Sequence, residues 1–148
     1  MSFLDKLGPI KDLPGMIQKL LPFLKTFGID PQSFIGKMER AQVEPRFMAG
    51  IPTVAARMEK EGNTPAAKAH GGDAERIFIR DAMYLLGKEA FKGILPSKFA
   101  VLVPKAADFL RDQHDDAVVA RVSPVLTETT PMQDALKLIV HEYVEHIF

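Results

Sequence analysis

Residues 131–148 read PMQDALKLIVHEYVEHIF, and this stretch decides the predicted fold class. Its apolar side chains recur at the three- and four-residue spacing that places them on one face of an α-helix. The predicted core face consists of Met132, Leu136, Ile139, Val140, Tyr143 and Ile147. Charged and histidine side chains fall on the opposite face. The stretch therefore predicts an amphipathic helix that packs one side against a protein core.

Prolines divide the rest of the chain into segments of helical length. Proline is favoured at the first position of a helix, because the N–H group that it lacks has no helical partner there. Four pairs fit such starts: Asp30-Pro31, Glu44-Pro45, Thr64-Pro65 and Thr130-Pro131. The sequence predicts an all-α protein, in which residues 1–148 form a single compact bundle of about seven short helices.

The predicted helices can be bounded by their apolar periodicity and by glycine. They cover residues 16–28, 31–42, 45–61 with a break or bend at Pro52, and 73–87 with Asp73 as cap and Gly87 as end. Residues 62–73 are the most loop-like stretch, and we expect them to form a hinge. Residues 99–103 and 117–122 fit either helix or strand, and we favour helix because 99–103 is short and has no evident partner strand.

Composition excludes several classes of function. The chain has 148 residues, 47% of them hydrophobic, and a formal net charge of zero, so it lacks the basic excess of a nucleic-acid binder. It contains no cysteine, which excludes disulfides, cysteine-bound metal clusters and thiol catalysis. Neither a signal peptide nor an apolar run long enough to span a bilayer is visible in the sequence. We therefore expect a soluble, cytoplasmic protein.

The last eight residues, HEYVEHIF, come within one position of the H-E-x-x-H zinc motif. That motif needs histidines four apart on a helix. Here His141 and His146 are five apart, which separates them by about 140° around the helix axis. The spacing predicts that these histidines and the neighbouring glutamates face water at a helix end, where a cation is mildly favourable.

A second polar cluster is RDQHDD, residues 111–116. We expect it to form a polar turn between two helices, with an aspartate capping the next one. If that turn met the terminal helix, His114, Asp115, His141 and Glu145 would be candidate metal ligands. We expect no bound metal or cofactor.

The predicted function is a non-catalytic helical interaction or assembly protein, a structural subunit or adaptor in a homo-oligomer or larger complex. Apolar side chains outside the predicted core face support it, because methionine and phenylalanine are adaptable contact residues. The candidate contacts are Leu138, Phe148, Met16, Leu20, Phe23 and Phe27. Two alternatives stay open: a metal-dependent hydrolase using the four candidate ligands, and a peripheral membrane protein that binds an anionic surface through the lysine-rich residues 1–28.

Overall fold

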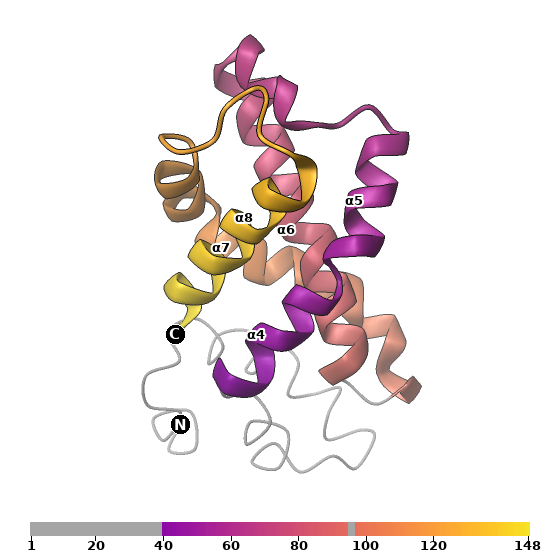
Figure 1. The fold of residues 1–148 in the computed structure, drawn as a ribbon. Coiled ribbons are helices and arrows are strands. Elements are labelled where there is room, and N and C mark those ends of the chain that lie inside the picture. Colours follow the sequence, from indigo (N-terminus) through magenta and orange to yellow (C-terminus); the bar gives the residue numbers. More distant parts are fainter. Residues whose placement is uncertain (1–39, 95–96) are drawn as a thin grey trace.

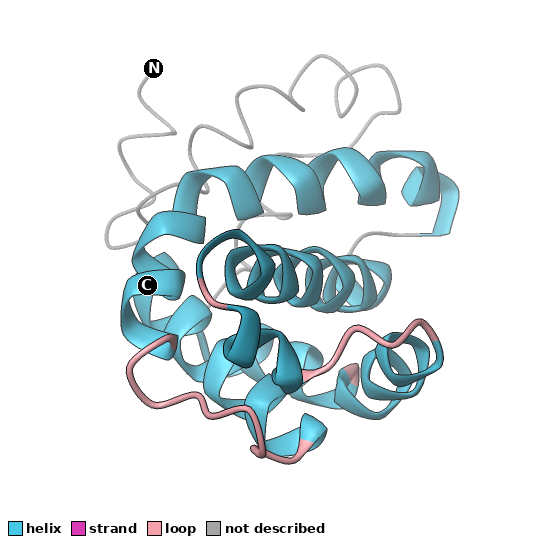
Figure 2. Ribbon diagram, turned by 90° about the horizontal axis from the view of Figure 1, so that it is seen from above, coloured by secondary structure: helices cyan, strands magenta, loops and turns pink. Residues whose placement is uncertain are grey.

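The computed structural model describes residues 40–94 and 97–148, and the regular elements of this part of the chain are all helices, joined by short loops (Figure 1). Its elements are α4 (Arg40–Ala49), α5 (Ile51–Lys60), the 3-10 helix η1 (Pro65–His70), α6 (Gly72–Ile94), the 3-10 helix η2 (Ser97–Leu102), α7 (Val103–Val122) and α8 (Met132–Ile147). No strand occurs within this part of the chain, which confirms the all-α prediction (Figure 2). The predicted helix over residues 16–28 lies outside the described residues, as does most of 31–42. The predicted total of about seven helices in one bundle therefore stays a prediction.

Helix α8 is central to the fold because it packs against α4, α5, α6 and α7. All six residues of its predicted core face are buried. Ala135 and Val144 are also fully buried, so the apolar face is wider than a single stripe. This breadth follows from the position of α8, which has α4 and α5 on one side and α7 on the other. The helix predicted from PMQDALKLIVHEYVEHIF is confirmed, and it begins one residue after Pro131.

Helix α6 is longer than predicted. It continues through Gly87 to Ile94, so Gly87 does not end the helix, and Asp73 lies in its first turn rather than before it. A Cβ atom placed on Gly87 would lie 3.4 Å from the Cβ of Ala107 on α7. Gly87 therefore lies at the contact between α6 and α7, where the space admits a methyl group.

Helix α7 corrects a second prediction, because it runs unbroken through residues 111–116. The expected polar turn is wrong: the cluster lies in the middle of a 20-residue helix. Residues 117–122 are part of the same helix, and residues 99–103 form most of η2 and the first residue of α7, so helix was the correct choice for both segments.

Two predictions made from prolines concern the junction between α4 and α5, and one of them is wrong. Pro45 lies inside α4 and does not start a helix. The predicted break near Pro52 is confirmed, since α4 ends at Ala49 and Pro52 lies in the first turn of α5. Gly50 separates the two helices and approaches α6 closely: a Cβ atom there would lie 2.7 Å from the Cβ of Glu89.

The end of α5 follows the sequence closely. Gly62 has a φ of 74°, and its N–H donates to the carbonyl of Glu59 while the N–H of Asn63 donates to that of Met58. This is the Schellman arrangement, in which a left-handed glycine satisfies the last carbonyls of a helix. In the predicted hinge, residues 65–70 form η1 instead of an irregular loop.

Candidate functional site

Two histidines from different helices meet at the C-terminal end of α8. The Nδ1 atoms of His114 on α7 and His146 on α8 are within hydrogen-bonding distance of each other. Their ring centroids are 4.6 Å apart and the rings are nearly perpendicular. His114 is 1% exposed and His146 is half-buried, so the contact forms part of the α7–α8 interface.

The histidine pair continues into an aromatic cluster that reaches α4. The ring centroid of His114 lies 5.9 Å from that of Tyr143, and Tyr143 makes an edge-to-face contact of 5.4 Å with Phe47. Tyr143 and Phe47 are both buried. The cluster therefore links α7, α8 and α4 through four rings at one end of the molecule.

A partly exposed ion pair lies at the same end of the molecule. Glu145 of α8 accepts a hydrogen bond from Arg40 at the start of α4, and Arg40 also pairs with Glu44. The hydrogen bond from Arg40 holds the pKa of Glu145 below its usual range. The two side chains are 41% and 38% exposed, so solvent screens much of their attraction. Figure 1 shows the consequence in the ribbon: the chain end after α8 lies beside the beginning of α4.

The candidate metal ligands do not form one group. Asp115 is directed to α6, where its carboxylate pairs with Arg76 at 2.9 Å and Arg80 at 3.2 Å. Glu145 pairs with Arg40, and His141 is exposed. Among residues 40–94 and 97–148, no three histidine, aspartate or glutamate side chains are arranged to hold a metal ion.

The expectation that both terminal histidines face water holds for His141 and is wrong for His146. His114 meets His146 because it belongs to the buried face of α7. It lies four residues after Leu110 and four before Val118, and both are buried. That spacing was visible in the sequence, but it carries information only if residues 103–122 are one helix.

A ladder of aspartates and arginines joins α6 to α7. The carboxylate of Asp115 forms ion pairs with two arginines of α6, and further ion pairs flank it. Arg76–Asp116 and Arg80–Asp112 also cross from α6 to α7, whereas Arg111–Asp112 and Arg111–Asp108 lie within α7. The cluster RDQHDD thus supplies most of the acidic half of this ladder, and its carboxylates act in packing the two long helices.

A second group of polar contacts, which the sequence did not predict, connects η1 to the start of α6 and the end of α7. Lys68 donates to the carbonyl oxygen of Ser123 at 2.6 Å and pairs with Glu75 at 3.0 Å. The hydroxyl of Ser123 donates to Glu75, which is 7% exposed as a residue. Lysine in this position satisfies a carbonyl at the C-terminus of α7, where a cation is favoured. The group fixes the predicted hinge segment to the body through Lys68.

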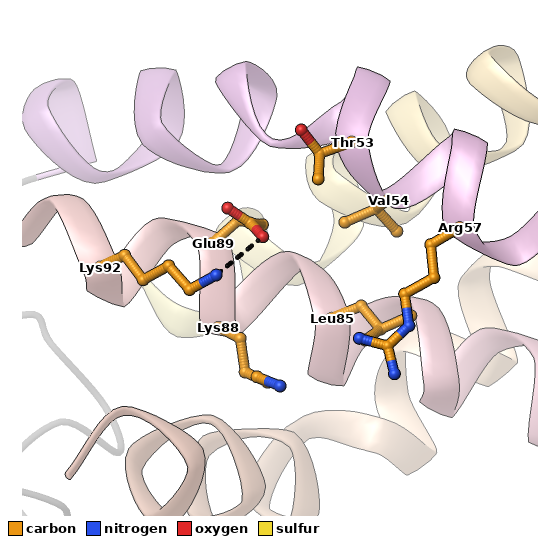
Figure 3. Close-up of a pocket in the computed structure, with 7 residues that line it drawn as sticks. All are labelled: Thr53, Val54, Arg57, Leu85, Lys88, Glu89 and Lys92. Carbon is orange, nitrogen blue, oxygen red and sulfur yellow. Dashed lines mark hydrogen bonds and ion pairs between the residues drawn. The ribbon is translucent and has the colours of Figure 1, made fainter. Parts of the chain in front are cut away.

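A shallow hollow lies between α5 and α6 (Figure 3). Arg57, Lys88 and Lys92 lie around it, together with Thr53, Val54, Leu85 and Glu89. Lys92 pairs with Glu89 on the same side of the hollow at 3.1 Å, since both residues belong to α6. Its volume of about 40 Å³ holds a few water molecules, well below the roughly 300 Å³ of a small-molecule site.

The predicted contact residues divide into two groups. Leu138 and Phe148 on α8 are half-buried, and Phe148 packs partly against the core. Met16, Leu20, Phe23 and Phe27 lie outside the described residues, as does the lysine-rich segment 1–28. Within the described part of the chain, no helix combines the length and the apolar character needed to cross a membrane.

Comparison with known proteins found no matching family model, no matching curated protein and no matching solved structure.

Proposed function

We propose that the chain is a non-catalytic helical interaction protein, a structural subunit or adaptor that assembles with itself or with a protein partner. The observation that carries the proposal is the partial exposure of Leu138 and Phe148. Leu138 lies on α8 and Phe148 directly follows it; both are large apolar residues of a deeply packed segment, yet both remain partly exposed. Apolar side chains at the edge of a packed helix provide contact area that a partner can bury.

The position of these residues also supports assembly. Phe148 lies beyond Glu145, and the Glu145–Arg40 pair fixes this end of α8 to the start of α4. The exposed part of Phe148 therefore lies beside an anchored end of α8, where it can contribute to a contact surface.

The described body is suited to present such a surface. Its core is continuous across α4 to α8, and the arginine–aspartate ladder holds α6 against α7. Exposed ion pairs are individually weak, but a network of several fixes the register of two helices. A body of this kind holds the edge of α8 in place without contributing chemistry of its own.

The test is native mass spectrometry and sedimentation velocity on the full chain over a wide range of concentration. We expect a metal-free oligomer that weakens by about tenfold or more in dissociation constant when Leu138 is replaced by aspartate. The matched control is Lys137→Asp, an exposed neighbour on the same helix. Deletion of Phe148 and the change Phe23→Asp test the other predicted contacts.

Two results would contradict the proposal. A monomer carrying a stoichiometric metal ion would replace assembly with metal chemistry. An oligomer that Leu138→Asp, loss of Phe148 and Phe23→Asp all leave intact would show that another surface makes the contact. Circular dichroism of each variant separates loss of association from loss of fold.

A further inference from the structure

The His114–His146 contact sets a limit on how many protons the native protein can hold. A neutral imidazole has one N–H group and one lone pair, so a hydrogen bond between two Nδ1 atoms needs one ring as donor and the other as acceptor. The neutral pair meets this requirement in either direction. The contact links α7 to α8, so whatever breaks it acts on the packing of two helices.

The first added proton is compatible with the contact. It enters at Nε2 of the donating ring, which then carries a positive charge and still donates from Nδ1 to its neighbour. Hydrogen bonds from a charged donor are stronger than neutral ones. The singly protonated pair therefore keeps the two helices together.

The second added proton is not compatible with it. It has to enter at Nδ1 of the accepting ring, and the two Nδ1–H groups then face each other with two positive charges at a ring separation of 4.6 Å. In the unfolded chain the same two side chains take up both protons below about pH 6.5. The native pair thus holds one proton fewer than the unfolded chain, and the two sites behave as a coupled unit.

The charged groups on the elements around the pair have partners of their own. On α8, Glu142 pairs with Arg121 of α7 at 3.6 Å. Glu145 pairs with Arg40 of α4, and Asp115 on α7 pairs with the arginines of α6. The remaining titratable neighbours on α8 are His141, which is exposed, and Tyr143, which is buried beside His114. These pairings direct the nearby carboxylates to arginines, so the second imidazole charge meets a cation instead of an anion.

We propose that the His114–His146 pair is an acid-sensitive latch, which holds the last turn of α8 against α7 and releases it when both rings are protonated. The released turn carries Phe148, which packs partly against the core while the latch is closed. The latch is tested separately from the assembly proposed above, because unfolding and amide exchange report contacts within one chain.

The expected size follows from the proton count. A deficit of one proton in the native state raises the unfolding constant by about tenfold for each pH unit below the imidazole range. Folding disfavours the second protonation of the pair. The stabilisation that the latch contributes is therefore complete near neutral pH and is lost as the pH falls. Within the imidazole range itself, between pH 6.5 and pH 5.5, the latch accounts for about a fivefold increase in the unfolding constant.

The experiment compares urea unfolding of the full chain between pH 7.5 and pH 5.5 in three proteins: wild type, His114→Asn and His141→Asn. We expect His114→Asn to lose the increase in the unfolding constant that the latch causes on acidification, because His146 can then take up its proton while it donates to the asparagine carbonyl. His141→Asn should keep the slope of the wild type. An equal slope in wild type and His114→Asn would overturn the latch, and so would an equal loss of slope in both variants.

A second measurement on the wild type decides the matter if His114→Asn does not fold. Nitrogen-15 imidazole spectra report the protonation of each ring, and amide hydrogen exchange reports the opening of the last turn of α8. We expect protection of residues 145–148 to persist through the first proton and to fall with the second. Full protonation of both rings with unchanged protection would refute the latch.

Discussion

Replacing Gly87 with alanine should stabilise this protein, although glycine at this position was expected to end a helix. Gly87 lies inside α6, and an added Cβ atom would meet the Cβ of Ala107 at 3.4 Å, which is an ordinary van der Waals contact. Alanine is favoured over glycine in a helix interior by about 1 kcal/mol. Tight packing against α7 opposes part of this gain. We expect the free energy of unfolding to rise by about 0.5–1 kcal/mol.

Gly62 provides the matched control because its situation is the reverse. Its φ of 74° is in the left-handed region, and no atom of the other described residues, its two chain neighbours apart, lies within 4 Å of the position of an added Cβ. The cost of alanine there is conformational and amounts to about 1 kcal/mol. The two Gly→Ala changes should therefore shift stability in opposite directions.

Urea and thermal unfolding followed by far-UV circular dichroism measure both effects. For a chain of this length, a change of 1 kcal/mol corresponds to about 2–5 °C in Tm. Gly87→Leu adds a test of the packing itself, since the larger side chain cannot fit against Ala107 and should cost about 1–3 kcal/mol. If Gly87→Ala destabilises the protein as Gly62→Ala does, then α6 ends at Gly87 and the account of the α6–α7 contact is wrong.

Three further predictions concern the same helices. Gly50→Ala should destabilise the protein by about 1–3 kcal/mol in urea unfolding, because the new methyl group would lie 2.7 Å from the Cβ of Glu89; unchanged stability would mean that α4 and α5 can move away from α6. Phe47→Ala should cost about 3–5 kcal/mol in the same assay, because the ring is 1% exposed and packs edge-to-face on an aromatic neighbour; a cost below about 1 kcal/mol would indicate a loosely packed site. Arg40→Gln should raise the pKa of Glu145 in a carbon-13 carboxyl titration, because the hydrogen bond from Arg40 is the main cause of its lowering. The Arg40–Glu145 pair therefore stabilises the fold above the ordinary glutamate pKa of 4.5 and loses its contribution as the pH falls through the lowered value, and a pKa of Glu145 that does not change would refute the pairing.

The ladder between α6 and α7 explains why a polar cluster was misread. Residues 111–116 look like a turn because four charged side chains and a histidine stand in succession. In the structure, however, the side chain of Asp115 is only 10% exposed and forms ion pairs with two arginines. Such a carboxylate is stable in a helix interior because cations from another helix surround it.

The histidines also show what local sequence patterns cannot predict. The sequence established that His141 and His146 cannot both bind one ion on the same face, and that spacing argument is unaffected by the fold. It could not show that His114 comes from α7 to meet His146, since no local pattern relates residues 32 positions apart. The pairing of these two rings depends on how α7 and α8 cross.

The sequence by itself determined the all-α class of the described chain, the buried face of α8 and the glycine end of α5. Each depends on interactions within a few residues, where periodicity and backbone geometry act directly. Only the tertiary structure decided that Gly87 lies at the α6–α7 contact, that α7 is continuous and that His146 is joined to His114. In these cases a small or polar side chain is explained by the atoms of another helix, and those atoms are brought within contact distance only when the chain folds.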